Sequence, residues 1–365
     1  MRVCFVLPGL HRVHRGAETA FESVAAELAK SEDCAVTLFG SGQPIASQPY
    51  TFIHVPCRPR ERFERWPTFP GIRTESAWEE LSFIPSLYRV YNPLDFDVSV
   101  TCSYPYTNWF LRSRRRNGYR PAHVYVTQNG DWACQSAKSE YRWFGCDGLV
   151  CTNPEYYERN KERWNSALIP NGVDSTRFFP GREHRSQFNI PEGVPIVLMV
   201  SALIESKRVL EAIEAVSLLD NVYLIVAGDG PLREQVLNLA AIKLPGRFQQ
   251  LTVAAHRMPT LYRCADLVLH MSLEEPFGNV YLEATASGLP IVANNHASTR
   301  WILEATGKYV DGRNKSCVAD SIKALLTHDA PEALSLRREL VERRYTWKAI
   351  AAQYQIHFEK ILSSL

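Results

Sequence analysis

The chain has 365 residues, of which 45% are hydrophobic and 22% charged, and its formal net charge is +2. This length accommodates two domains of ordinary size, and the composition is typical of a globular protein rather than a disordered or fibrous one. The near balance of charge gives no reason to expect nucleic acid as a partner. No stretch approaches the roughly 20 apolar residues that a membrane-spanning helix needs.

The cysteines and the N-terminal residues indicate the cellular compartment expected for the chain. Nine cysteines are scattered without a C-x-x-C pair, which favours a reduced, cytoplasmic environment over a disulfide framework or a zinc site. The first residues, MRVCFVLPG, have too short an apolar part for a signal peptide, so they predict a first buried strand.

Short apolar strands alternate with amphipathic helices along the whole chain, which predicts an α/β fold. The expected elements of the first half are the strand Val3–Leu7, a helix from about Ala17 to Lys30, and the strands Val36–Phe39, Val98–Cys102, His123–Val126 and Gly148–Thr152. After a turn-rich break at Pro170–Asp174, the expected strands are Pro195–Val200, Val222–Ala227, Phe248–Val253, Leu267–Met271 and Ile291–Ala293. A final helix, Trp347 to Leu365, has on one face Ile350, Tyr354, His357 or Phe358, and Ile361.

The loop after the first strand ends on Gly16, directly before the first helix. A glycine at a helix N-terminus lets a phosphate approach the backbone, although a plain turn is the alternative. Gly9 and Gly16 lie too far apart for the G-x-G-x-x-G fingerprint, which disfavours NAD.

The segment Thr127–Trp132, TQNGDW, is unusually polar for the end of a strand. Asn129 and Asp131 are good binders of hydroxyl groups, so we expect them in a pocket for a ligand that carries hydroxyls. The alternative is a simple Asn-Gly turn.

Two basic stretches, Arg58–Arg65 and Arg112–Arg116 with Arg120, lie in the first half. Such patches can contact an anionic lipid surface. Acidic residues interleaved in the first stretch favour a solvated face instead.

Lys207 and Arg208 lie between a strand that ends near Ser201 and a helix that begins after Arg208. A cation at this edge of a sheet stabilises negative charge on a leaving phosphate, which an arginine holds with two donors and a lysine as a compact charge. Two merely solvated bases are the alternative, but cations at a helix start oppose the helix dipole.

The segment from Ala265 to Ala293 is the most informative part of the chain. It predicts a buried strand, a loop with Glu275, and a helix from about Val280 to Ser287 with Asn279 as N-cap, Glu283 in its first turns and Gly288 beyond its end. Open α/β sheets bind ligands at this edge, and free N–H groups at the helix start bind anions. Two carboxylates flanking an anion site suit a nucleotide sugar, although both glutamates could instead be solvated.

With these residues the chain resembles the retaining glycosyltransferases of family 4, whose signature is E-P-F-G-x-x-x-x-E-A followed by G-x-P-V-x-A. Glu275 and Glu283 have the required spacing, and the flanking matches are Pro276, Phe277, Gly278, Ala284, Gly288 and Pro290. The resemblance implies the GT-B architecture, in which two Rossmann-like domains with parallel sheets face each other across a cleft. It implies an acceptor-binding domain of residues 1–168 plus 347–365 and a donor-binding domain of residues 169–346. The last helix would cross back onto the first domain, unless it simply closes the second.

The resemblance also assigns roles to individual residues. Glu275 would contact the hydroxyls of the transferred sugar, and Glu283 the ribose. Asn129 and Asp131 would belong to the acceptor or donor-sugar pocket. The diphosphate would be held by Lys207 and Arg208 and by the N–H groups of Gly16, Phe277, Gly278, Asn279 and Val280. The nucleobase would lie near Ala255, whereas Gly228 and Gly230 would mainly shape a turn. No metal and no cofactor are expected, because protein cations and dipoles neutralise the leaving group.

The chain departs from the family pattern at Arg15, which stands in place of a glycine, and at Ala202, which stands in place of an arginine whose charge Arg208 could supply. It also lacks the histidine that many relatives have near Thr127–Trp132 and the glycine that they often have near Ala255. The expected function is that of a cytoplasmic retaining glycosyltransferase in polysaccharide or glycoconjugate synthesis. Its partners would be a nucleotide-sugar donor, a hydroxyl acceptor that is lipid-linked or a glycan, and the inner membrane surface as a peripheral contact. The alternatives are a catalytically silent nucleotide-sugar-binding subunit and a nucleotide-sugar epimerase.

Overall fold

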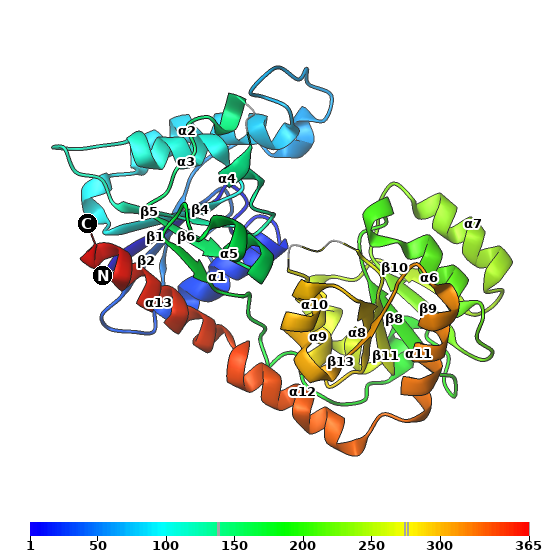
Figure 1. The fold of residues 1–365 in the computed structure, drawn as a ribbon. Coiled ribbons are helices and arrows are strands. Elements are labelled where there is room, and N and C mark those ends of the chain that lie inside the picture. The colour runs from blue at the N-terminus through cyan, green and yellow to red at the C-terminus, as the bar shows by residue number, and fades with distance from the viewer. Residues whose placement is uncertain (137–138, 274, 276, 365) are drawn as a thin grey trace. The chain divides into compact units, whose positions relative to one another are not determined.

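The computed structural model describes residues 1–136, 139–273, 275 and 277–364. The chain divides into two compact units, one formed by Met1–Asn171 with Trp347–Leu365 and the other by Gly172–Thr346. Each unit contains one parallel β-sheet with helices packed against it, as Figure 1 shows. The predicted α/β class with two Rossmann-like halves is therefore confirmed.

The first unit has a seven-stranded sheet in the order β3-β2-β1-β4-β5-β6-β7. Its strands are β1 Arg2–Val6, β2 Ala35–Gly40, β3 Thr51–His54, β4 Val98–Cys102, β5 Ala122–Val126, β6 Gly148–Cys151 and β7 Ser166–Leu168. The two strands of this unit that the sequence did not predict, β3 and β7, are short, lie at the sheet edges and contain no fully buried residue. An edge strand has no continuous apolar run to reveal it.

Helices cover both faces of this sheet. Successive side chains of β1 point to opposite faces, so they pack in two different cores. Val3 and Phe5 pack in one core with α1 (Gly16–Leu28) and α13 (Trp347–Ser363). Cys4 and Val6 pack in another with α2 (Glu75–Val90) and α3 (Pro105–Ser113). The remaining helices are α4 Trp132–Gln135 and α5 Pro154–Asn160.

The last helix of the chain, α13, is part of the first unit and packs against α1 (Figure 1). Its buried residues include the predicted Ile350, Tyr354, Phe358 and Ile361. The helix lies so close to β6 that a Cβ on Gly148 would lie 2.1 Å from Ile361 Cδ1.

The second unit has a six-stranded sheet in the order β10-β9-β8-β11-β12-β13. Its strands are β8 Ile196–Val200, β9 Tyr223–Ala227, β10 Phe248–Leu251, β11 Leu267–His270, β12 Ile291–Asn294 and β13 Gly307–Val310. Its helices are α6 Val209–Val216, α7 Arg233–Lys243, α8 Met258–Arg263, α9 Asn279–Ala286, α10 Ala297–Leu303, α11 Lys315–Thr327 and α12 Pro331–Arg344.

The order of strands reverses direction once in each sheet, between β1 and β4 and between β8 and β11. Both pairs are parallel, so the carboxyl ends of the two strands lie at the same edge. Loops that leave neighbouring strands in opposite directions at this edge open a crevice where α/β proteins bind ligands.

Candidate active site

The Glu275 segment follows the predicted order of strand, loop, helix and strand. The N-cap of α9 is Gly278 rather than Asn279, which corrects the sequence prediction. Gly278 has φ 83°, in the left-handed region that a residue with a Cβ adopts at a cost, and this explains why glycine takes the cap position. Gly288 also has positive φ, at 75°, and ends the helix as predicted. Pro276, part of the predicted signature, lies outside the described residues.

Glu275 lies at the centre of a cluster of polar side chains. Its Oε2 forms an ion pair with Lys207 Nζ and lies 3.2 Å from His270 Nε2. Lys207 lies in the loop after β8, and Glu275 lies in the loop after the adjacent β11. Because these two strands pair in parallel, both residues lie at the same edge of the sheet. The structure thus joins two segments that the sequence analysis had treated separately.

The contacts of Glu275 keep its carboxylate ionised. Burial alone would raise the pKa of Glu275, but the hydrogen bond from His270 and the positive charge of Lys207 outweigh burial and lower it to about 2. A carboxylate with this pKa does not act as a proton donor near neutral pH. It can accept hydrogen bonds from hydroxyl groups and stabilise positive charge.

Arg208 occupies the N-cap of α6 in the left-handed conformation, with φ 55°. Its Nε donates to Glu211 Oε1 at 3.0 Å. Its Nη1 is buried and has no hydrogen-bond partner among the described residues. A guanidinium in this state retains one donor for a ligand, because an unsatisfied buried donor costs free energy until it is paired.

Glu283 lies in α9, where it accepts a hydrogen bond from Tyr262 Oη at 2.7 Å. Burial raises the pKa of Glu283, while the hydrogen bond from Tyr262 and the charge of Arg177 oppose that rise. Arg177 Nη2 also donates to the carbonyl oxygen of Ala255 at 3.3 Å. Arg177 therefore links the residue predicted for the ribose with the one predicted for the nucleobase.

Three residues of this site were missed by the sequence analysis: His270, Tyr262 and Arg177. His270 is the last residue of β11 and only 3% exposed, and a histidine that ends an apolar strand before a loop is a signal that could have been read. Tyr262 and Arg177 lie on α8 and on a turn after the domain boundary, and no local pattern connects either of them with Glu283.

Two glycines allow close packing of the loops that carry the cations. A Cβ on Gly228 would lie 1.9 Å from Ser201 O, and one on Gly230 would lie 2.6 Å from Leu203 O. These contacts support the structural role predicted for this turn, since the loop after β9 fixes the loop that leads to Lys207.

The other predicted site residues belong to the first unit. Gly16 is the first residue of α1. Asn129 is exposed, and its Nδ2 donates to Ser103 Oγ at 2.8 Å. Asp131 is 6% exposed, and its carboxylate is held by Arg159 at 2.9 Å and by Asn160 Nδ2 at 2.9 Å. Asn129 is thus available to a ligand, whereas Asp131 holds α4 against α5.

The sequence contains one Asp-x-Asp, Asp95-Phe96-Asp97, a spacing that can bind a metal. Asp97 directly precedes β4 and so lies at the amino end of the sheet, opposite the ligand-binding edge. Its carboxylate pairs with Arg2 at 2.8 Å, and Asp95 Oδ1 accepts from Asn92 Nδ2 at 2.8 Å. Both acids have structural partners there.

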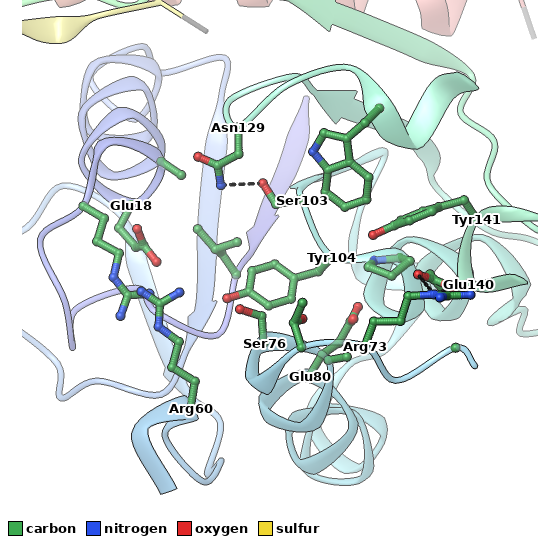
Figure 2. A pocket seen from close by; sticks show the side chains of 18 residues that line it. Glu18, Arg60, Arg73, Ser76, Glu80, Ser103, Tyr104, Asn129, Glu140 and Tyr141 are labelled. Carbon is green, nitrogen blue, oxygen red and sulfur yellow. Dashed lines mark hydrogen bonds and ion pairs between the residues drawn. The ribbon is translucent and has the colours of Figure 1, made fainter. Parts of the chain in front are cut away.

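The basic stretch Arg58–Arg65 includes the short 3-10 helix Arg60–Phe63. Arg60 lines a cavity of the first unit (Figure 2), so this stretch is not solvated throughout. Across the described part of the chain, the helices are too short or too polar to cross a membrane.

Comparison with known proteins agrees with this architecture. Sucrose-phosphate synthase from Thermosynechococcus elongatus aligns over 100% of both chains, with a TM-score of 0.79 and 20% sequence identity. HepE from Anabaena, solved in complex with UDP-glucose, aligns over 100% of both chains with a TM-score of 0.73 and 16% identity. The fold is therefore the GT-B fold of glycosyltransferases.

Sequence comparison finds similarity mainly in the second unit. Residues 181–347 match the family model described as glycosyl transferases group 1. The lipopolysaccharide core biosynthesis glycosyltransferase LpsE of Rhizobium meliloti is 29% identical over 54% of this chain and 57% of its own. A GDP-mannose-dependent phosphatidylinositol monomannoside mannosyltransferase of Mycobacterium tuberculosis is 30% identical over 60% of this chain and 63% of its own. The matched region thus spans less than two thirds of these relatives.

Proposed function

We propose that the protein is a retaining glycosyltransferase, which moves a sugar from a nucleoside diphosphate sugar to a hydroxyl group of an acceptor. The supporting observation is the cluster of Glu275, Lys207 and His270 at the point where the strand order of the second sheet reverses. One permanently ionised carboxylate beside a cation suits a ligand that presents both hydroxyls and phosphates.

In the proposed reaction, the bond between the anomeric carbon and the diphosphate oxygen breaks, and its electron pair leaves with the diphosphate. The acceptor oxygen forms the new bond on the same face of the sugar, and its proton passes to the departing diphosphate oxygen. Lys207 stabilises the charge that builds on the leaving group. Glu275 accepts hydrogen bonds from the sugar and stabilises the positive charge at the anomeric carbon.

The rest of the donor would be bound around this centre. Glu283, held by Tyr262, binds the ribose hydroxyls, and the backbone near Ala255 meets the base. The N–H groups at the start of α9, from Phe277 to Val280, complete the phosphate site within the second unit. Arg208 donates its free Nη1 to the diphosphate in place of the arginine that Ala202 has replaced.

The acceptor would be a glycan or a lipid-linked molecule, in polysaccharide or glycoconjugate synthesis. Relatives are named for lipopolysaccharide core synthesis and for transfer to phosphatidylinositol mannoside, and both names support this class. We place the reaction in the cytoplasm, with the inner membrane surface as a peripheral contact. The nine free cysteines are compatible with that reducing setting.

The test is nucleotide release from a panel of UDP-, GDP- and ADP-sugars, with and without EDTA, followed by NMR of the product's anomeric configuration. We expect release with one base, unaffected by EDTA, and a product with the donor's configuration. An inverted product would contradict the retaining mechanism, and loss of release in EDTA would contradict metal independence.

A catalytically silent subunit is the second candidate, favoured by Ala202 at the position of a phosphate-binding arginine. It predicts tight binding of a nucleotide sugar without release or transfer. An epimerase would instead convert the donor sugar into its epimer without any acceptor.

A further inference from the structure

Arg177 connects the two parts of the second unit that the proposed function gives to the nucleoside. Its Nη2 donates to the carbonyl oxygen of Ala255 at 3.3 Å, and its positive charge counteracts the rise that burial causes in the pKa of Glu283. Ala255 follows β10, and Glu283 lies in α9, which follows β11, so both belong to loops and helices at the carboxyl edge of the sheet. The proposed reaction gives Arg177 itself no role.

The backbone of Arg177 is held in a turn at the start of the unit. Asp174 Oδ1 accepts from the N–H of Thr176 at 3.0 Å and from that of Arg177 at 3.2 Å. Phe178 is buried and meets Tyr262 edge to face, with ring centroids 5.6 Å apart. The side chain of Arg177 is exposed and has no carboxylate within 4.0 Å among the described residues. The turn therefore presents a guanidinium whose remaining N–H groups are available to a ligand.

The carbonyl groups beside this guanidinium are already used. Ala255 O accepts from the N–H of Met258 as well as from the guanidinium, so both of its lone pairs are occupied. Ala254 O accepts from the N–H of Arg257 at 2.8 Å. The N–H groups of Val253 and Ala254, in contrast, donate to no acceptor in the described part of the chain. The segment between β10 and α8 thus offers free hydrogen-bond donors and few free acceptors.

Nucleobases fall into two classes at such a surface. Uracil and guanine carry an oxo group at the position where cytosine and adenine carry an amino group. An oxo group accepts hydrogen bonds from N–H groups, whereas an amino group needs an acceptor. An arginine is a frequent partner of the oxo group and the neighbouring ring nitrogen of guanine. A surface rich in N–H groups therefore favours the oxo class and leaves an amino group without a partner.

We infer that Arg177 is a specificity-determining residue, which selects a nucleoside diphosphate whose base carries an oxo group, uracil or guanine, over one whose base carries an amino group. The inference rests on the proposed function, because that function places the base beside Ala255. Arg177 acts in two ways: it donates to the oxo group, and it occupies the carbonyl oxygen that an amino group would need.

Isothermal titration calorimetry of the full chain with UDP, GDP, CDP and ADP tests the inference. We expect UDP or GDP to bind about 10- to 100-fold more tightly than both CDP and ADP, which is the discrimination typical of a well-placed pair of hydrogen bonds to a base. In Arg177→Ala this preference should fall several-fold, because the oxo base loses a partner and the amino base gains Ala255 O as an acceptor. Any loss that acts on the ribose through Glu283 affects all four nucleotides equally and cancels in the ratio.

Two further variants make the test specific. Arg257→Ala removes a neighbouring arginine whose Nη2 donates to Gln187 O at 3.2 Å and whose Cζ lies 4.5 Å from the centroid of the Phe188 ring, so the preference should stay unchanged. Arg177→Lys keeps the positive charge near Glu283 but not the planar pair of N–H donors, so it should retain only part of the preference.

Three results would overturn the inference: CDP or ADP binds as tightly as UDP and GDP, the preference survives intact in Arg177→Ala, or Arg257→Ala reduces it equally. Arg177 is exposed, and Asp174 bonds its backbone rather than its side chain, so the alanine variant should keep the fold. Sugar transfer measured on the same samples separates the two proposals. The preference without transfer overturns only the proposed transfer, and transfer without the preference overturns only the inference. If none of the four nucleotides binds, both are wrong.

Discussion

Lys207 Nζ and Glu275 Oε2 form an ion pair that joins the loop after β8 to the loop after β11. The side chains are 19% and 18% exposed, so solvent screens the pair only in part. In the proposed reaction, the phosphates of the donor draw Lys207 toward themselves and the sugar hydroxyls take its place on Glu275. The pair therefore helps to keep the carboxylate of Glu275 ionised and holds both groups in position before the donor arrives.

Lys207→Ala should lower the rate of sugar transfer by roughly 10²-fold or more, as the loss of one stabilising group on a developing oxyanion does. It should also raise the pKa of Glu275, because one of the two groups that lower it is removed. Steady-state kinetics and a pH–rate profile measure both effects.

Lys315→Ala is the matched control for this substitution. Lys315 forms an ion pair with Glu214 at 2.6 Å in the same unit, but its side chain is 45% exposed. Removal of an exposed pair changes stability by about 1 kcal/mol or less and should leave turnover unchanged. Equal losses in the two variants would contradict a specific role for Lys207.

The sequence predicted the parts of this site that lie close together along the chain. The loop, helix and turn around Glu275 follow from local rules for glycine, proline and apolar runs. The partners of Glu275 and Glu283 come from other segments, and single-sequence patterns do not reveal which side chains meet. The partner of Asp131 was equally hidden from the sequence: its residue type suggested a sugar pocket, and its carboxylate pairs with Arg159 from α5.

Glu283→Ala should weaken the binding of the nucleoside diphosphate by about 10- to 100-fold, since hydrogen bonds to a charged group contribute about 1.5–3 kcal/mol. Burial raises the pKa of Glu283, so affinity in the wild type should increase as rising pH ionises the carboxyl. Calorimetry at several pH values measures both. Glu342→Ala, which removes a surface carboxylate paired with Arg338 at 2.7 Å, is the control. If Glu283→Ala binds the nucleoside diphosphate as tightly as the wild type, the assignment of Glu283 to the ribose is wrong.

Glu80 should make the stability of the first unit fall as pH rises. Burial raises its folded pKa from the ordinary value of 4.5 to about 8, so between these values the folded state keeps a proton that the unfolded state has lost. The slope is at most about 1.4 kcal/mol per pH unit. Glu80→Gln cannot ionise, so the wild type should lose stability relative to this variant from pH 5 to pH 8. Urea unfolding of both proteins across this range measures the difference, and parallel curves would contradict it.

Phe358→Ala should destabilise the first unit by about 3–5 kcal/mol, because its ring is fully buried in the core that α13 shares with α1 and the sheet. Ile356→Ala on the same helix is the control, since Ile356 is 66% exposed and should cost little. Hydrogen exchange followed by mass spectrometry reports the two units separately. Faster exchange in residues 172–346, without a change in the first unit, would contradict this prediction.

The membership of α13 in the first unit has a consequence for synthesis on the ribosome. All segments of the second unit are made before Trp347, so that unit can fold while the chain is still growing. The first unit is begun earlier but lacks one wall of its core until α13 emerges. The unit translated first is therefore completed last, and a nascent chain stalled near residue 346 would expose that open core to chaperones and proteases.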